Sequence, residues 1–253
     1  MSRQLVLTAL PGLPSIQPGD DLAGLIRQGL ARADLKLVTG DVLVIAQKII
    51  SKAEGRQCLL SSVQPSARAD QLANETGKDP RLVELILRES RQVLRWRPGV
   101  LIVEHRLGFV CANAGIDHSN VEGEEDSVLL LPKDPDASAQ AMRKALTDAD
   151  GPAPGILIID SHGRAWRMGT VGVAIGLAGL PGLLDLRGTP DLYGRKLEVT
   201  QVGLADELAA AGSLLLGQAG EGTPVVHVRG LPYPLRDASL GELIRPESED
   251  LFR

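Results

Sequence analysis

The sequence Ile156-Leu-Ile-Ile-Asp160-Ser161-His162-Gly163-Arg164 begins with four consecutive aliphatic residues and ends with polar ones. The apolar run predicts a buried strand over 156–160, which delivers Asp160 at its carboxyl end. A strand end is a rigid mount for a catalytic group, and an Asp held there is suited to binding a metal. Arg164 has the fork geometry that pairs with phosphate or carboxylate. The alternative interpretation is a structural Asp that caps the next turn.

Further apolar runs and helical periodicities lie on both sides of this strand. They predict strands over 5–10, 41–50, 99–103, 109–112, 196–203 and 224–228, and helices over 22–30, 66–77, 80–87, 134–146 and 206–216. Strands and helices mix without a regular β-α-β alternation, which predicts an α+β fold, with a mixed α/β fold as the alternative. We treat 1–253 as a single unit. An inserted or intertwined subdomain is compatible with this pattern, although periodicity does not locate it.

Composition excludes several classes of protein. The chain has 253 residues, 43% of them hydrophobic, and a net charge of −5, which argues against a strongly basic nucleic-acid binder. Aromatic residues make up 2%, too few for a base-stacking platform. Cys58 and Cys111 lack the spacing of a disulfide scaffold or zinc site. Because no apolar run is long enough to span a membrane, we expect a cytoplasmic protein with no membrane partner.

The 28 glycines cluster mostly between Gly108 and Gly230. Glycine is chosen where the backbone takes a positive φ or comes close to a ligand, so this clustering indicates an enzyme with a site built from loops. The glycine-rich run 171–184 is too hydrophobic to leave exposed and too broken for a buried helix. We therefore expect it to form a dimer interface.

Asp117 and Asn120 lie three residues apart in Asn113-Ala-Gly-Ile-Asp117-His-Ser-Asn120, which follows a predicted strand. In a tight turn their oxygens could converge and bind Mg²⁺ or Mn²⁺, with phosphate oxygens completing the shell. An Asx-turn cap between two elements is an equally good interpretation. Neither GxxxxGK[ST] nor GxGxxG occurs, so a phosphate site here would be of another kind.

Two other segments carry clusters of cations. Lys52, Glu54 and Arg56 follow a predicted strand and could clamp a nucleotide phosphate, although a solvated turn is the simpler interpretation. Arg187 and Arg195 lie beside acidic residues in a glycine-rich stretch and could bind an anionic ligand, although a surface ion-pair network would look the same.

Several segments of the chain together resemble the coenzyme F420-0:L-glutamate ligase family. They are SKAEGR at 51–56, KDPRLVELILRES at 78–90, NAGIDHSN at 113–120, DSHGR at 160–164, DLYGRKLEVT at 191–200, ADELAAA at 205–211 and PVVHVRGL at 224–231. They occur in the family's order, and the resemblance covers about 13–231. The patterns AGIDxSN, D-S/T-x-G-R and DLYGRxLE are together highly specific.

The resemblance implies a GTP-dependent ligase that adds L-glutamate to the lactyl phosphate side chain of the deazaflavin precursor F420-0 through an acyl phosphate. It also implies the addition of further γ-linked glutamates, two divalent cations (Mg²⁺ or Mn²⁺), K⁺ as a further candidate, a homodimer and a two-part α+β subunit. A C-terminal reductase-like domain, which some relatives carry, is not expected.

The family's motifs carry site residues over to this chain. The implied metal contacts are Asp117, Asp160, Ser161 (usually Thr in the family) and Gln218, which could contact the nucleotide instead. The implied nucleotide contacts are Leu13, Pro14, Ser15, Ile16, Gln47, Lys48, Lys52 and Asn120. Candidates for binding an anionic substrate are Arg164, Arg187 and Arg195. Ala46-Gln47-Lys48 replaces a more hydroxyl-rich version, and His162 is given no role.

Two other functions fit the same residues. One is a metal-dependent phosphatase or nucleotidyltransferase on the same scaffold, which would release phosphate without forming an amide. The other is a non-catalytic nucleotide-binding module, for which Asp117, Asp160, Lys52 and Arg164 together would be unnecessary. The number of glutamates added, the precursor variant and the choice of Mg²⁺ or Mn²⁺ stay open.

Overall fold

The main sheet collects the most apolar strands of the chain, in the order β1-β12-β2-β8-β9. The computed structural model describes residues 4–117, 126–147 and 151–251. The strands of this sheet are β1 (Val6–Ala9), β2 (Val42–Ala46), β8 (Gly155–Arg164), β9 (Arg167–Ala178) and β12 (Val225–Arg229). Strands β2 and β8 are parallel, whereas the other neighbouring pairs are antiparallel.

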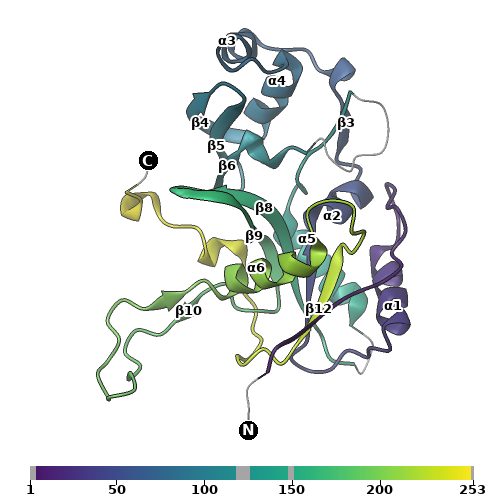
Figure 1. Cartoon of the computed structure of the whole chain (residues 1–253), viewed down its shortest axis with the longest axis vertical. Helices are drawn as coiled ribbons and strands as arrows, with labels where there is room; N and C mark the ends of the chain where they lie inside the picture. The colour runs from purple at the N-terminus through teal and green to yellow at the C-terminus, as the bar shows by residue number, and fades with distance from the viewer. Residues whose placement is uncertain (1–3, 118–125, 148–150, 252–253) are drawn as a thin grey trace.

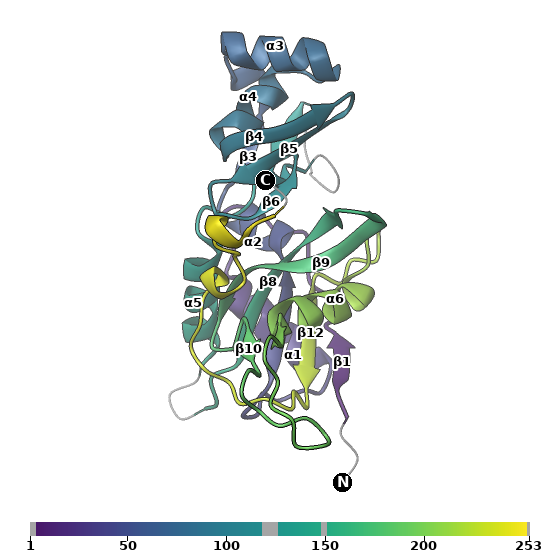
Figure 2. The same ribbon diagram turned by 90° about the vertical axis from the view of Figure 1, so that its left-hand side faces the viewer.

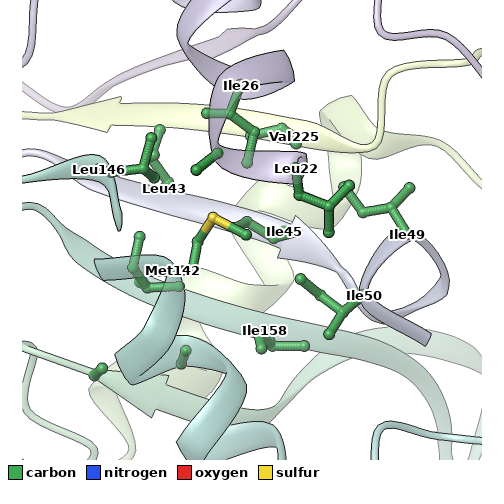
Figure 3. Packing of buried hydrophobic residues seen from close by; sticks show 14 of the residues in the cluster. Leu22, Ile26, Leu43, Ile45, Ile49, Ile50, Met142, Leu146, Ile158 and Val225 are labelled. Atoms are coloured by element: carbon green, nitrogen blue, oxygen red, sulfur yellow. The ribbon is translucent and has the colours of Figure 1, made fainter. Parts of the chain in front are cut away.

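Helices cover both faces of this sheet. Helices α1 (Leu22–Arg32) and α5 (Pro135–Leu146) pack on one face, and α6 (Leu204–Leu216) packs on the other. Leu43 and Ile45 of β2 face α1 and α5, whereas Val42 and Val44 face α6. Figure 3 shows the first face, with Met142 lying among the aliphatic side chains. Burial on both faces explains why β2 and the first half of β8, up to Ile159, are continuously apolar instead of alternating.

A second unit is inserted between β2 and β8 and lies at the top of Figure 1 and Figure 2. After α2 (Gln47–Ala53), its elements are β3 (Gln57–Leu59), η1 (Leu60–Ser62), α3 (Ala67–Thr76), α4 (Pro80–Arg88), β4 (Ser90–Arg97), β5 (Val100–His105), β6 (Val110–Ala112), η2 (Asn113–Gly115) and β7 (Ser127–Leu129). They enclose a separate core that includes Leu72, Ile86 and Leu101. The sheets β4-β5-β6 and β3-β7 belong to this unit. The α+β class is confirmed.

An arm leaves the body after β9 and extends away from it (Figure 1). Its base is the short pair β10 (Leu184–Asp185) and β11 (Gln201–Val202). Leu192 and Tyr193 in this arm are 90% and 86% exposed. The chain then passes through α6 and β12 and ends in the 3₁₀ turns η3 (Leu240–Glu242) and η4 (Glu247–Glu249). Among the described residues, no helix combines the length and apolarity needed to cross a bilayer.

Three strands predicted from the sequence have other bounds in the structure, and some strands were missed. The strand predicted over 156–160 continues to Arg164, so Asp160 lies inside it and not at its end. The strand predicted over 41–50 ends at Ala46, because Ile49 and Ile50 serve the buried side of helix α2 instead. The strand predicted over 196–203 is reduced to Gln201–Val202, since the preceding residues lack a sheet to join and are mostly exposed. Strand β4 was not predicted at all, because most of its residues are polar and only partly covered.

The glycine-rich run 171–184 is covered within the chain, which removes our argument that it forms a dimer interface. A Cβ at Gly172 would lie 2.5 Å from the carbonyl oxygen of Ala209 in α6. A Cβ at Gly176 would lie 2.4 Å from Cβ of Pro135 in α5. The glycines of β9 therefore allow both helices to approach the sheet closely.

Asp41 connects β2 to β12 through a buried ionic cluster. Its carboxylate is 1% exposed and accepts hydrogen bonds from Nε and Nη2 of Arg229 at 2.9 and 2.7 Å. Nε2 of His227 lies 2.9 Å from Oδ2 of Asp41. Burial acts to raise the pKa of Asp41, but the hydrogen bonds from Arg229 and the closeness of His227 outweigh it and the pKa is lowered. The charged carboxylate therefore stabilises the fold at neutral pH, and this contribution is lost as pH falls through the lowered pKa.

We predict that Asp41→Ala lowers the free energy of unfolding by about 1.5–3 kcal/mol at pH 7, because it removes a buried carboxylate that accepts two hydrogen bonds from Arg229. The matched control is Asp185→Ala, which removes an exposed ion pair with Arg187 and should lower the free energy of unfolding much less. Urea unfolding measures both changes. Equal losses in the two variants would contradict the role of the buried cluster.

Candidate active site

The parallel pairing of β2 and β8 brings two polar segments to one edge of the main sheet. Ala46, the last residue of β2, pairs with Ile159, the last aliphatic residue of β8 before that strand turns polar. Gln47 and Asp160 follow directly, and so lie next to each other where the apolar strands stop. This edge is where open sheets with parallel strands commonly place ligands.

A cavity of about 370 Å³ opens at this edge. Nine of the residues singled out from the sequence line it together: Leu13, Pro14, Ser15, Gln47, Lys48, Lys52, Asp160, Ser161 and Gln218. They come from the segment before α1, from α2, from β8 and from the loop after α6. Lys48 and Lys52 are four residues apart on α2, and therefore lie on one side of the helix. The cavity thus combines two ammonium groups with carboxylate, hydroxyl and amide oxygens.

Asp117 is held beside this cavity by an unusual turn. Asn113, Ala114 and Gly115 all have left-handed backbone angles, with φ of 50°, 54° and 66°. Asn113 Oδ1 accepts a hydrogen bond from the backbone N–H of Leu101 at 3.1 Å, which secures the turn. Such angles are unfavourable for residues other than glycine, and they persist where the surroundings enforce them, often at functional sites.

The backbone of Asp117 is fixed by its pairing with Leu129, through hydrogen bonds of 3.0 and 2.9 Å in the two directions. Its Oδ2 accepts a hydrogen bond from Nε2 of Gln47 at 2.9 Å and lies 3.6 Å from Nζ of Lys48. Asp117 is therefore linked directly to two residues that line the cavity.

Electrostatics single out Asp117 further. Burial raises its pKa, the charge of Asp160 adds to the effect, and Lys48 and Gln47 oppose it, so that the pKa rises from 3.8 to about 6. Two carboxylates close enough to disfavour each other's charge, in a poorly solvated place, form a site that a divalent cation would stabilise.

The oxygen donors at this edge suit Mg²⁺ or Mn²⁺. Beside the two carboxylates, the hydroxyl of Ser161 donates a hydrogen bond to Oε1 of Gln218 at 2.9 Å, which places both near Asp160. Within the described part of the chain, no three His, Cys, Asp or Glu side chains are grouped to share a metal ion. The residues therefore fit a metal whose shell is completed by phosphate oxygens or water.

Other residues singled out from the sequence lie elsewhere. Ile16 is 4% exposed and belongs to the core instead of the cavity wall. The expected clamp of Lys52, Glu54 and Arg56 does not form: Arg56 pairs with Glu89, and Glu54 accepts a hydrogen bond from Ser138. Asn120 lies outside the described residues.

The arginine candidates separate into two groups. Arg187 pairs with Asp185 on the arm, as the surface-network interpretation expects, and Arg195 is exposed there. Neither lines the two cavities described for this chain. Arg164 lines the second of these cavities, farther along β8.

Sequence reasoning missed two features of the site. His162, which was given no role, has Nε2 3.0 Å from Oδ2 of Asp160. Period-two alternation along β8 would have placed both side chains on one face of the strand. Ser213 and Thr223 also line the cavity, from the end of α6 and the loop before β12. The cluster of glycines at 217–222 was the available signal for that loop.

Comparison with known proteins is consistent with this site. The family model described as F420-0:Gamma-glutamyl ligase matches residues 12–230. A coenzyme F420:L-glutamate ligase of Methanothermobacter thermautotrophicus is 47% identical over 249 residues, covering 98% of both chains. Proteins of the same name from Methanopyrus kandleri and Archaeoglobus fulgidus are 48% and 46% identical, covering 94% and 96% of this chain and 93% and 94% of their own lengths. This chain therefore belongs to the F420-0:gamma-glutamyl ligase family.

Proposed function

We propose that this protein forms an amide bond between L-glutamate and the deazaflavin precursor F420-0, using GTP to activate the precursor's carboxylate. The observation that carries the proposal is that residues from separate parts of the sequence, each matched to the family's motifs, converge on one cavity. The relatives named above are coenzyme F420:L-glutamate ligases. The cavity supplies the charges that such a reaction requires.

The lysine side chains of α2 support binding of a nucleoside triphosphate. Lys48 and Lys52 line the cavity from one side of the helix, where their ammonium groups can bind phosphate oxygens. Leu13 and Pro14 line the same cavity and offer apolar surface for the rest of the nucleotide. Asp117 and Asp160 would hold a divalent cation, which would neutralise phosphate charge during transfer. Two such ions, with K⁺ as a further candidate, stay predictions from the family resemblance.

The chemistry explains why a nucleotide is needed. A carboxylate does not condense with an amine at neutral pH. In the proposed reaction, a carboxylate oxygen of the precursor attacks the γ-phosphorus and the bond to the β-phosphate oxygen breaks, which releases GDP. The amine of glutamate then attacks the acyl carbon, phosphate leaves and the amine loses a proton. The fixed charges of Lys48 and Lys52 would stabilise the negative charge on the transferred group.

Further properties implied by the resemblance are proposals of the same kind. They are the addition of more γ-linked glutamates, a cytoplasmic location and a homodimer. With the glycine-rich run covered within the chain, the exposed apolar residues of the arm are the feature that favours a dimer. Leu192, Tyr193 and Val199 are each more than 80% exposed. Large apolar side chains gathered on a projecting segment are typical of protein interfaces.

The function is tested by incubating the protein with precursor, GTP and glutamate. We expect a product with the mass of the precursor plus one or more glutamyl groups. With oxygen-18 in the precursor carboxylate, label should appear in the released phosphate, because that oxygen bridges carbon and phosphorus in an acyl phosphate. Amide formation without label in phosphate would contradict the acyl phosphate. Phosphate release without amide would contradict the ligase.

We predict that Asp117→Asn lowers turnover more than about 100-fold, because it removes charge that the metal and phosphates require. The same variant should stabilise the metal-free protein at pH 7 by roughly 1–2 kcal/mol. Because the folded-state pKa is raised from 3.8 to about 6, ionisation of the carboxylate lowers stability progressively between those pH values, and the full loss is present at pH 7. Product formation and thermal unfolding measure the two effects.

Asp206→Asn is the matched control for Asp117→Asn. Burial also raises the pKa of Asp206, whose Oδ1 accepts the backbone N–H of Ala174 at 2.9 Å, away from the cavity. Asn keeps that acceptor, so this variant should retain turnover. Wild-type turnover by Asp117→Asn at saturating metal would contradict the assignment of Asp117.

We predict that Lys52→Ala raises the KM for GTP about ten- to a hundredfold, because one ammonium–phosphate contact contributes about 1.5–3 kcal/mol. The KM for glutamate should change much less. Lys144→Ala, which removes an exposed lysine on α5, is the control and should leave both values unchanged. An unchanged KM for GTP in Lys52→Ala would show that Lys52 does not contact the nucleotide. Steady-state kinetics with each substrate varied in turn measures these values.

A further inference from the structure

A second cavity, of about 1080 Å³, lies at the far end of the β8–β9 hairpin. It is bounded by the tip of that hairpin, by strands β4, β5 and β6 of the inserted unit, and by the C-terminal segment. It is lined by four arginines, Arg95, Arg164, Arg167 and Arg245, and by one aspartate, Asp250. This is a strong concentration of positive charge in a chain whose net charge is −5.

Arg164 is the most telling of these arginines. It is partly buried, and its Nη1 is buried with no hydrogen-bond partner among the described residues. Other partly buried guanidinium groups, such as those of Arg56 and Arg106, pair with the carboxylate of Glu89. A buried guanidinium nitrogen without a partner is costly in a native protein, unless a ligand supplies the missing acceptor. The ligand that fits is an anion.

The same cavity also has apolar and aromatic walls. Leu94, Ile102 and Val110 contribute aliphatic surface. Trp166, at the hairpin tip, is 88% exposed and has a left-handed backbone with φ of 63°. An indole held outward at the rim of an arginine-rich cavity is suited to stacking on a planar aromatic ring. The ligand therefore combines a flat ring with an anionic side chain.

This cavity is close to the candidate active site. Arg164 lies four residues after Asp160 on β8, which corresponds to on the order of 13 Å along an extended strand. Cys111 of β6 also lines the second cavity, and β6 packs against β8, the strand that carries Asp160. A ligand held at Arg164 could therefore extend one end to the metal and nucleotide residues.

We propose that this second cavity binds the deazaflavin precursor, with its ring against Trp166 and its phosphate at the arginines. The carboxylate that accepts the γ-phosphoryl group would then point along β8 toward Asp160. This inference rests on the proposed function, since it assigns a place to that reaction's acceptor substrate. Arg95, Arg167, Arg245 and Trp166 become substrate-binding residues, and Arg164 anchors the phosphate from within the cavity.

Binding is tested with F420-0 alone, without GTP or glutamate. The chain contains two tryptophans, so Trp96→Phe leaves Trp166 as the single tryptophan reporter. We expect F420-0 to quench the emission of Trp166 in a saturable way, whereas GTP alone should not. If the fluorescence of Trp166 does not change when F420-0 is added but does change with protein concentration, a second copy of the chain covers the cavity. That result would overturn the proposal.

The arginines are tested in the same background. Arg95→Gln and Arg167→Gln change exposed residues, so both variants should fold, and each should raise the Kd for F420-0 about fivefold or more. Arg97→Gln is the matched control: it lies on the same strand and is exposed but does not line the cavity, and its Kd should equal that of the parent. The KM for GTP should not change in any of them.

The two proposals can fail separately. If the wild-type protein makes amide while Arg95→Gln and Arg167→Gln keep the parent's Kd and KM for F420-0, the precursor binds elsewhere and the ligase assignment stands. If F420-0 quenches Trp166 and the arginine variants weaken its binding but no amide forms, the binding site stands and the proposed reaction fails.

Discussion

The parallel pairing of β2 with β8 is the constraint on which the rest of the molecule depends. β2 and the first half of β8, up to Ile159, are aliphatic and buried, so neither face of this part of the pair can remain in water. Helices α1 and α5 on one side and α6 on the other satisfy that requirement. Polar groups therefore begin where the parallel pairing ends. Gln47 and Asp160 follow the last pair, Ala46 and Ile159, and so lie next to each other, although β8 itself continues to Arg164.

A structural feature could be predicted from the sequence where neighbouring residues determine it, and could not be predicted where contacts between distant residues determine it. The strand that leads to Asp160 was recognisable because its aliphatic run stops abruptly at a carboxylate. The end of β2 was not recognisable, because Ile49 and Ile50 look the same in a strand and on the buried side of a helix. The left-handed turn that positions Asp117 includes Asn113 and Ala114, whose conformation is enforced by tertiary contacts. The inserted unit has its own core, but the hydrophobic periodicity of the sequence does not show where this unit begins or ends.

The candidate site shows the same division between local and distant information. Residue types alone left Asp117 balanced between a functional and a structural interpretation and favoured a solvated turn for Lys52, and similarity to a family shifted both interpretations. The structure then separates candidates that the sequence treated alike. Lys52 faces the cavity, whereas Arg56, four residues later, is committed to Glu89. Which of two neighbouring cations is available for a ligand depends on a carboxylate 33 positions away, which no local pattern reports.

The buried pair of Asp41 and Arg229 spans 188 positions of the chain. On the ribosome, at about 5–20 residues per second, Asp41 emerges roughly 10–40 s before its partner has been made. β2 lacks both of its sheet neighbours until β8 is synthesised, and it lacks β12 for almost the whole interval. The inserted unit, whose core lies within residues 60–130, is complete much earlier. The inserted unit can therefore fold first during synthesis. Strand β2, which ends beside the active site, acquires its last sheet neighbour, β12, near the end of synthesis.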